Sequence, residues 1–169
     1  MSTTVFTIMD SPFGPLLLSG TLPDGGGTAA LAAVTAPGQK GARTEPADDW
    51  VHDPDALAEA VDQLTAYFAG TRTVFDLPLA PVGTEFRQRI WAALDDIPYG
   101  ETITYGQLAA AAGASPSAVR AVGGAVGANP LLIVRPCHRV IGANGSLTGF
   151  AAGVENKRRL LRLESGALF

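Results

Sequence analysis

The sequence of 169 residues contains a single cysteine, Cys137, so the chain forms no internal disulfide. One thiol and two histidines are too few ligands for a structural zinc site, and we expect no metal and no cofactor. No apolar run approaches the roughly 18 residues of a membrane-spanning helix. The start of the chain lacks the basic and apolar stretches of a signal peptide. These absences predict a cytoplasmic protein, without a membrane partner, whose thiol stays reduced.

Positive charge is scarce in the first half of the chain. Residues 1–79 hold three Lys and Arg against ten Asp and Glu, a balance of −7, whereas residues 80–169 hold nine against six, a balance of +3. The asymmetry suggests that only the second half meets a polyanion. The alternative is that the difference in surface charge between the two domains serves solubility alone.

Residues 1–79 are predicted to form a small supporting domain, a sheet with one packed helix and no cluster of catalytic residue types. β-Branched and aromatic runs between turn residues predict strands at residues 4–9, 15–19 and 31–34. Residues 36–52 are rich in Gly, Pro and charge and predict a loop. Asp53 is the expected N-cap of the helix, Pro54 its first residue, and Gly70 ends it.

Residues 80–169 are predicted to form a mostly helical, winged-helix-like domain, which gives the chain an α/β (α+β) fold. Residues 77–83, with two prolines and a glycine, are the candidate linker. A T-x-x-Q capping box opens one helix at Thr104, and Ser115-Pro116 opens the next, which makes a helix-turn-helix. Helices are expected from the N-cap Thr84 to a point before Pro98, and at residues 104–112, 116–126 and 154–164, with a strand-like run at 131–134 and a loop at 142–150.

The second helix of this motif is poorly equipped to read a base sequence. Arg120 is its one long polar side chain, and Gly123 and Gly124 each cost about 1 kcal/mol in a helix relative to alanine. Such a helix suits double-stranded DNA bound through the minor groove, largely independently of sequence. Arg120 is then free to take the place of an extruded base. The alternative is that the small residues pack against another helix and Arg120 is simply solvated.

Cys137 has cationic sequence neighbours, His138 and two arginines, and such neighbours lower the pKa of a thiol. This favours a reactive cysteine. The alternative is that Cys137 is a small buried hydrophobe, which is the commoner role of a free cysteine.

Several motifs follow one another across residues 84–165. They are Thr-Tyr-Gly-Gln-Leu-Ala at 104–109, Arg-Ala-Val-Gly-Gly-Ala at 120–125, Gly-Ala-Asn-Pro at 127–130, Pro-Cys-His-Arg-Val at 136–140 and a closing stretch at 157–164. In these motifs the chain resembles the O6-alkylguanine-DNA alkyltransferase family, also called methylated-DNA–protein-cysteine methyltransferases. Over residues 1–79 only the length and the strand–helix layout are similar.

The resemblance implies DNA repair by a single, stoichiometric transfer of the alkyl group to Cys137. The substrate would be a flipped-out O6-alkylguanine, and also O4-alkylthymine. His138 is implied as a base that acts on the thiol through a bridging water, with Glu164 orienting the imidazole. Asn129 is implied to brace the active-site turn by hydrogen bonds.

The resemblance also implies which residues meet DNA and the base. Arg120 would enter the duplex as the nucleotide leaves it. Tyr105 would push at the adjoining phosphate and donate a proton or hydrogen bond to the departing guanine. The remaining positions implied are Ser115, Gly123 and Gly124 at the DNA, and Val140, Phe150 and Ala151 at the base pocket.

Residue chemistry supports these roles separately. Displacing guanine needs a thiolate on one side and a proton donor on the other. Consecutive residues do not face each other, so a water between Cys137 and His138 is reasonable. Glu164 lies in the last turn of its helix, where a carboxylate is unfavourable, which points to a role elsewhere. A structural ion pair with Lys157, on the same helix face, is the competing explanation.

Phe150 departs from the family pattern, which has tyrosine there in many members, and this affects tolerance of bulky alkyl groups rather than the reaction. Some relatives bind zinc through N-terminal cysteines, and this chain has none of them. Two other functions fit parts of the sequence: a damage sensor that binds alkylated DNA without repair, and a Cys-His hydrolase. We expect a monomer on DNA, and the sequence leaves open whether several copies bind cooperatively.

Overall fold

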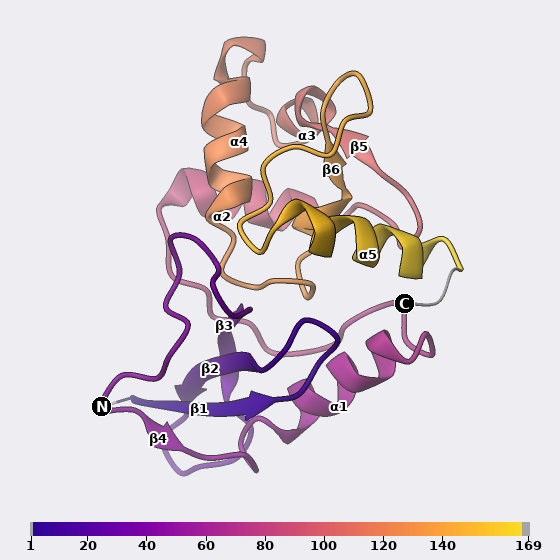
Figure 1. The fold of residues 1–169 in the computed structure, drawn as a ribbon. Coiled ribbons are helices and arrows are strands. Elements are labelled where there is room, and N and C mark those ends of the chain that lie inside the picture. Colours follow the sequence, from indigo (N-terminus) through magenta and orange to yellow (C-terminus); the bar gives the residue numbers. More distant parts are fainter. Residues whose placement is uncertain (1, 167–169) are drawn as a thin grey trace.

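The structure, a computed structural model, describes residues 2–166. Its first half is a four-stranded sheet of β1 (Thr3–Met9), β2 (Leu16–Leu22), β3 (Ala30–Thr35) and β4 (Val51–His52), in the order β3-β2-β1-β4 (Figure 1). β1, β2 and β3 pair antiparallel, and they confirm the three predicted strands. β4 pairs parallel to β1 inside the segment predicted as a loop. Its two residues are both exposed, so no hydrophobic pattern marks it.

One helix, α1 (Ala58–Phe68), lies beside the strands of this sheet (Figure 1). It begins later than predicted, because Pro54 to Leu57 form a turn in which Leu57 N–H donates to the Pro54 carbonyl. Asp53 Oδ1 accepts a hydrogen bond from Ala56 N–H at 3.1 Å, so Asp53 caps that turn and not the helix. The helix ends before Gly70, which has the left-handed φ of 77° expected of a stop.

The second half is mostly helical, as predicted. It contains α2 (Glu85–Leu94), α3 (Tyr105–Ala111), α4 (Val119–Gly127) and α5 (Val154–Glu164), with the short parallel strands β5 (Ile103–Thr104) and β6 (Val140–Ile141). The capping box is present, since Thr104 Oγ1 accepts from Gln107 N–H and the Gln107 side chain accepts from Thr104 N–H. Segment 77–83 runs along β3, with Leu31 N–H donating to Pro78 O at 2.8 Å.

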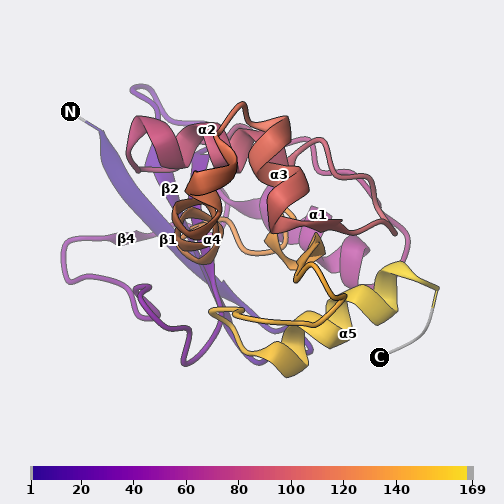
Figure 2. The same cartoon turned by 90° about the horizontal axis from the view of Figure 1, so that it is seen from above.

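The helix-turn-helix is formed by α3 and α4, which cluster with α2 when seen from above (Figure 2). Its second helix starts as a 3₁₀ turn, η1 (Pro116–Ala118), before α4 begins. Ser115 is the N-cap residue of this turn and Pro116 its first residue, as predicted, although the Ser115 hydroxyl bonds the Ser117 hydroxyl and no backbone N–H.

The prediction of a strand-like run at residues 131–134 is wrong. Leu131 forms one isolated bridge to Val34, and the chain then turns sharply. Val134 N–H donates to the Leu132 carbonyl at 2.8 Å, and Ile133 takes a φ of 72° that β-branched residues rarely adopt. The residues are buried, so the apolar run reflects core packing and not a strand. Among residues 2–166 no helix is long and apolar enough to cross a membrane.

Candidate active site

Cys137 lies at the start of the 3₁₀ turn η2 (Cys137–Arg139), with 5% of its surface exposed. It faces a narrow pocket between the end of α4, the turn after it and the loop before α5. The cavity measures about 10 Å³, at the lower limit for one water molecule. The residues that line it with Cys137 are Gln39, Val126, Gly127, Asn129, Leu132, Gly149, Phe150 and Ala151.

Asn129 holds the turn that carries the cysteine. Its Oδ1 accepts from Leu131 N–H at 3.1 Å, and its Nδ2 donates to the carbonyls of Arg135 at 3.0 Å and Leu131 at 3.3 Å. One buried amide therefore spans both ends of the bend that includes the strained Ile133. The end of α4 and the thiol are joined through these bonds.

His138 is completely buried, and its Nε2 lies 2.7 Å from Glu164 Oε2. Burial lowers the pKa of His138, so the imidazole is neutral at physiological pH. A neutral ring that donates from Nε2 keeps a lone pair on Nδ1. Nδ1 is buried and has no partner among the described residues. His138 therefore keeps one ring nitrogen that is free to accept a hydrogen bond or a proton.

Glu164 is the centre of a buried hydrogen-bond network. Besides His138, it accepts from Arg139 Nε at 2.7 Å and from the Tyr67 hydroxyl at 2.6 Å. Burial alone raises the pKa of Glu164, but the hydrogen bonds from His138 and Arg139 outweigh burial and lower the pKa to about 2. The carboxylate stays ionised and fixes the imidazole.

The pKa of the Cys137 thiol differs from the prediction based on its sequence neighbours. Burial raises the pKa of Cys137, and the nearby Asn129 amide and Lys157 ammonium lower it less. Arg139 is unavailable to the thiol because its guanidinium is bound to Glu164 and to the Ile97 carbonyl. The expectation of a lowered pKa is therefore wrong, and the resting cysteine is a protonated thiol.

Lys157 is 1% exposed and donates from Nζ to the carbonyls of Val140 at 2.6 Å and Thr148 at 3.2 Å. It makes no ion pair with Glu164, so that competing explanation is excluded. Val140 is buried at the start of β6 and does not line the pocket, whereas Phe150 and Ala151 do.

Tyr105 is the first residue of α3, and its hydroxyl donates to the Thr148 carbonyl at 3.3 Å. Burial raises the pKa of Tyr105, which keeps the phenol protonated.

Arg120 and Ser115 are exposed near the start of the second helix of the helix-turn-helix. Arg120 lies about 10 Å along α4 from the pocket residue Gly127. Added Cβ atoms at Gly123 and Gly124 meet nothing closer than 4.0 Å.

Sequence reasoning missed the roles of Tyr67, Arg139 and Lys157 around this site. Lys157 and Arg139 belong to the motifs that carry the resemblance, but only their burial reveals that they support the cysteine turn. Tyr67 lies on the buried face of α1, and its sequence context resembles that of any core aromatic residue.

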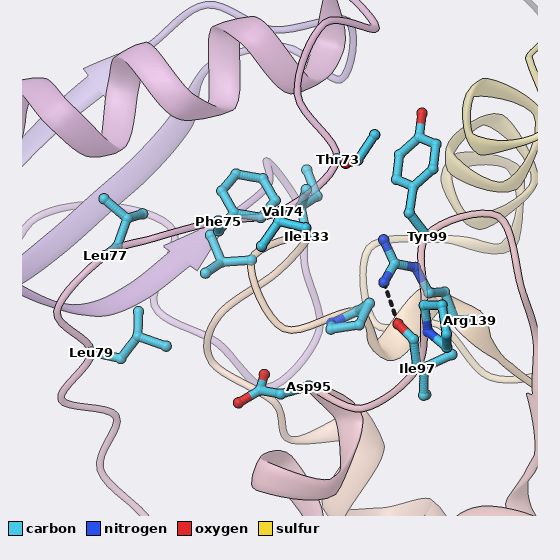
Figure 3. Close-up of a pocket in the computed structure, with 13 residues that line it drawn as sticks. Thr73, Val74, Phe75, Leu77, Leu79, Asp95, Ile97, Tyr99, Ile133 and Arg139 are labelled. Carbon is cyan, nitrogen blue, oxygen red and sulfur yellow. Dashed lines mark hydrogen bonds between the residues drawn. The ribbon is translucent and has the colours of Figure 1, made fainter.

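A larger cavity of about 350 Å³ lies on the other side of the cysteine turn (Figure 3). Arg139 reaches into it and donates to the Ile97 carbonyl at 2.6 Å, close to Tyr99. Cys137 does not line this cavity, so it is not the place where the thiol meets a substrate.

The fold and the site define a helix-turn-helix protein that holds a free cysteine beside a buried histidine–glutamate pair. Two family models agree with this class over residues 4–81 and 85–166. The ribonuclease-like domain of 6-O-methylguanine DNA methyltransferase matches residues 4–81, and the DNA binding domain of the same protein matches residues 85–166. The chain belongs to the 6-O-methylguanine DNA methyltransferase family.

Individual relatives are similar over nearly their full length. Methylated-DNA–protein-cysteine methyltransferase of Methanosarcina acetivorans is 49% identical over 94% of this chain and 97% of its own. The protein of the same name from Mycobacterium tuberculosis H37Rv is also 49% identical, over 94% and 91%. The crystal structure of Mycobacterium tuberculosis OGT in complex with DNA matches with a TM-score of 0.83 and 49% identity, over 96% of this chain and 94% of that one.

Proposed function

We propose that this protein repairs alkylated DNA directly, by transferring the alkyl group of O6-alkylguanine to Cys137. The observation that carries the proposal is the buried His138, neutral, fixed by Glu164 and with Nδ1 free beside the cysteine turn. The names of the similar proteins, and the DNA complex of one of them, support this activity and DNA as partner. O4-alkylthymine is a second substrate with the same alkyl–oxygen linkage.

The reaction forms a bond between Cys137 Sγ and the alkyl carbon and breaks the bond from that carbon to O6. The thiol proton passes through a water to His138 Nδ1, and Tyr105 donates a proton or hydrogen bond to the departing guanine. Over the whole reaction one proton leaves the thiol and one reaches guanine. A thioether has no easy route back to a thiol, so each molecule reacts once.

DNA binding is assigned to the outer face of the helix-turn-helix. We infer minor-groove binding, largely independent of sequence, because Arg120 is the one long polar side chain on α4 and Gly124 is exposed beside it. Arg120 then replaces the flipped nucleotide, with Ser115 and Gly123 near the backbone. We infer a monomer acting in the reducing cytosol, where a free thiol persists.

The number of methyl groups transferred per protein molecule tests this proposal. A limiting amount of protein is incubated with excess duplex oligonucleotide that carries isotope-labelled O6-methylguanine. We expect transfer to stop at one label per protein, and Cys137→Ser to accept none. Tight binding without transfer supports the damage sensor instead, and transfer beyond one equivalent supports a hydrolase or another turnover enzyme.

A further inference from the structure

Gln39 belongs to the first half of the chain, yet it lines the pocket in front of Cys137. It sits in the loop between β3 and β4, which reaches toward the lower end of α4 (Figure 1). The same loop borders a second hollow with Gly127 and Asn129, next to that helix end. Gln39 as a whole is only 6% exposed.

The loop is held firmly in this place. Gln39 Oε1 accepts from Ala36 N–H at 3.0 Å, and Gln39 N–H donates to the Ala36 carbonyl at 3.2 Å. The Thr35 hydroxyl donates to the Arg43 carbonyl at 2.9 Å farther along the loop. Lys40 N–H donates to the carbonyl of Ala151 at 3.2 Å, which fastens the loop to the wall of the pocket.

The other end of the Gln39 side chain is left without a partner. Its Oε1 is used by Ala36, but Nε2 donates to no atom of residues 2–166. A primary amide has two N–H donors there, and because Nε2 is not among the buried side-chain atoms without a partner, it reaches solvent in the free protein. A side-chain donor that no protein atom uses, on a residue that lines the pocket with Cys137, is available to an acceptor bound there.

We propose that Gln39 Nε2 donates a hydrogen bond to the O6 edge of the alkylated base bound at Cys137. This inference rests on the proposed function. The O6-alkyl carbon has to face Sγ, so the same edge of the base faces the wall that Gln39 shares with Phe150 and Ala151. Once O6 is alkylated, that edge carries only acceptors: O6, N1 and N7.

The hydrogen bond also favours the reaction itself. As the alkyl–O6 bond breaks, negative charge develops on the purine, and a donor already in place binds it more strongly than the neutral base. Gln39 is thus a catalytic residue supplied by the first half of the chain. That half is then part of the substrate site as well as a support.

Three variants test this inference on the full-length protein: Gln39→Leu, Gln39→Glu and Thr35→Val. Gln39→Leu removes the donor and also the acceptor for Ala36, while Gln39→Glu keeps that acceptor and, as a carboxylate, has no donor. Thr35→Val loosens the same loop without touching the pocket. The measurements are the second-order rates of methyl transfer from free O6-methylguanine and from duplex DNA, with thermal unfolding as a check on folding.

We expect both Gln39 variants to lose about tenfold or more in rate with the free base and the duplex alike, since the contact is to the base. Thr35→Val should stay within about twofold of the unchanged protein. Gln39 variants that react at the unchanged rate, or a Thr35→Val loss as large as theirs, would overturn the inference. If the unchanged protein itself places no methyl on Cys137, the proposed function fails instead.

Discussion

At the scale of single residues, Cys137 combines two properties that the sequence presented as alternatives. It is buried like a small hydrophobe, and burial raises the pKa of its thiol. It also stands beside a neutral histidine with a free nitrogen. The thiol is therefore protonated at rest, and the proposed transfer requires its proton to leave.

The neutral state of His138 predicts the pH dependence of transfer. Because burial holds the pKa of this imidazole below its ordinary value of 6.5, the base stays available throughout the physiological range. The second-order transfer rate from free O6-methylguanine should be flat from pH 8 down to pH 6.5 and should fall only at lower pH. A rate that already halves near pH 6.5 would contradict a buried, neutral histidine.

Glu164 predicts a loss of stability in acid. Its pKa drops from 4.5 to about 2 on folding, so the unfolded chain binds the proton first as the pH falls. The resulting stabilisation, about 3 kcal/mol, is complete above pH 4.5 and is lost as the pH falls toward 2. Urea unfolding should show that Glu164→Gln costs several kcal/mol at pH 7, because Arg139 loses its partner, and clearly less at pH 3. An equal cost at both pH values would contradict this.

The residue scale is also where sequence reasoning was weakest. Cationic neighbours of Cys137 suggested a lowered thiol pKa, but adjacent side chains point in different directions, and Arg139 turns to Glu164. Lys157 and Glu164 share a helix spacing that suggested an ion pair, yet Lys157 binds main-chain carbonyls. Spacing gives the face of a helix, whereas the partner depends on the element packed against it.

At the scale of elements, α4 has two different faces. Val122 and Ala125 are buried, and Trp91 donates from Nε1 to the Ala125 carbonyl at 2.8 Å. Arg120 and Gly124 are exposed on the rest of the helix. The same short helix thus packs small residues against another helix and leaves a second face, with Arg120, exposed.

The Arg120→Ala variant tests whether the exposed face of α4 takes part in extruding the damaged nucleotide. The substitution should slow methyl transfer from duplex DNA strongly and leave transfer from the free base unchanged, because extrusion costs a few kcal/mol only in the stacked duplex. The transfer rates of the variant and the unchanged protein are measured in parallel with duplex DNA and with the free base. Equal losses on both would show that Arg120 has no part in replacing the flipped nucleotide.

The Gly124→Ala variant distinguishes the effect of this glycine on the stability of α4 from its effect on how closely DNA can approach the helix backbone. The new Cβ meets nothing within 4 Å, so the variant should gain about 0.5–1 kcal/mol in free energy of unfolding. If the glycines let the duplex come close to the helix backbone, the same variant binds duplex DNA more weakly. Chemical unfolding and a DNA-binding titration measure the two effects, and a stabilised variant with unchanged binding would rule out the close approach.

Elements with their own local signals were predicted well. The capping box at Thr104 and the stop at Gly70 depend on chemistry within a few residues, and both are present. The run from Leu131 to Val134 failed because an apolar run is equally typical of a strand and of a buried turn. The Asn129 amide, which accepts from Leu131 and donates to Arg135, organises that turn.

At the scale of the whole molecule, the two halves of the chain meet at the cysteine. The Tyr67 hydroxyl of α1 binds Glu164 of α5, and Lys40 of the β3–β4 loop binds Ala151 in the pocket wall. Such long-range contacts leave no pattern in the sequence, which explains why the first half was predicted only as a support. The α/β (α+β) fold itself followed from strand and helix periodicities and is confirmed.

Intact mass spectrometry followed by peptide mapping tests the central claim most directly. The protein is incubated with a duplex oligonucleotide that carries one O6-methylguanine, and its mass is compared before and after. We predict a gain of one methyl group, located on the peptide that contains Cys137, with unmodified guanine left in the DNA. An unchanged protein mass, or a methyl group on any other residue, would contradict the account.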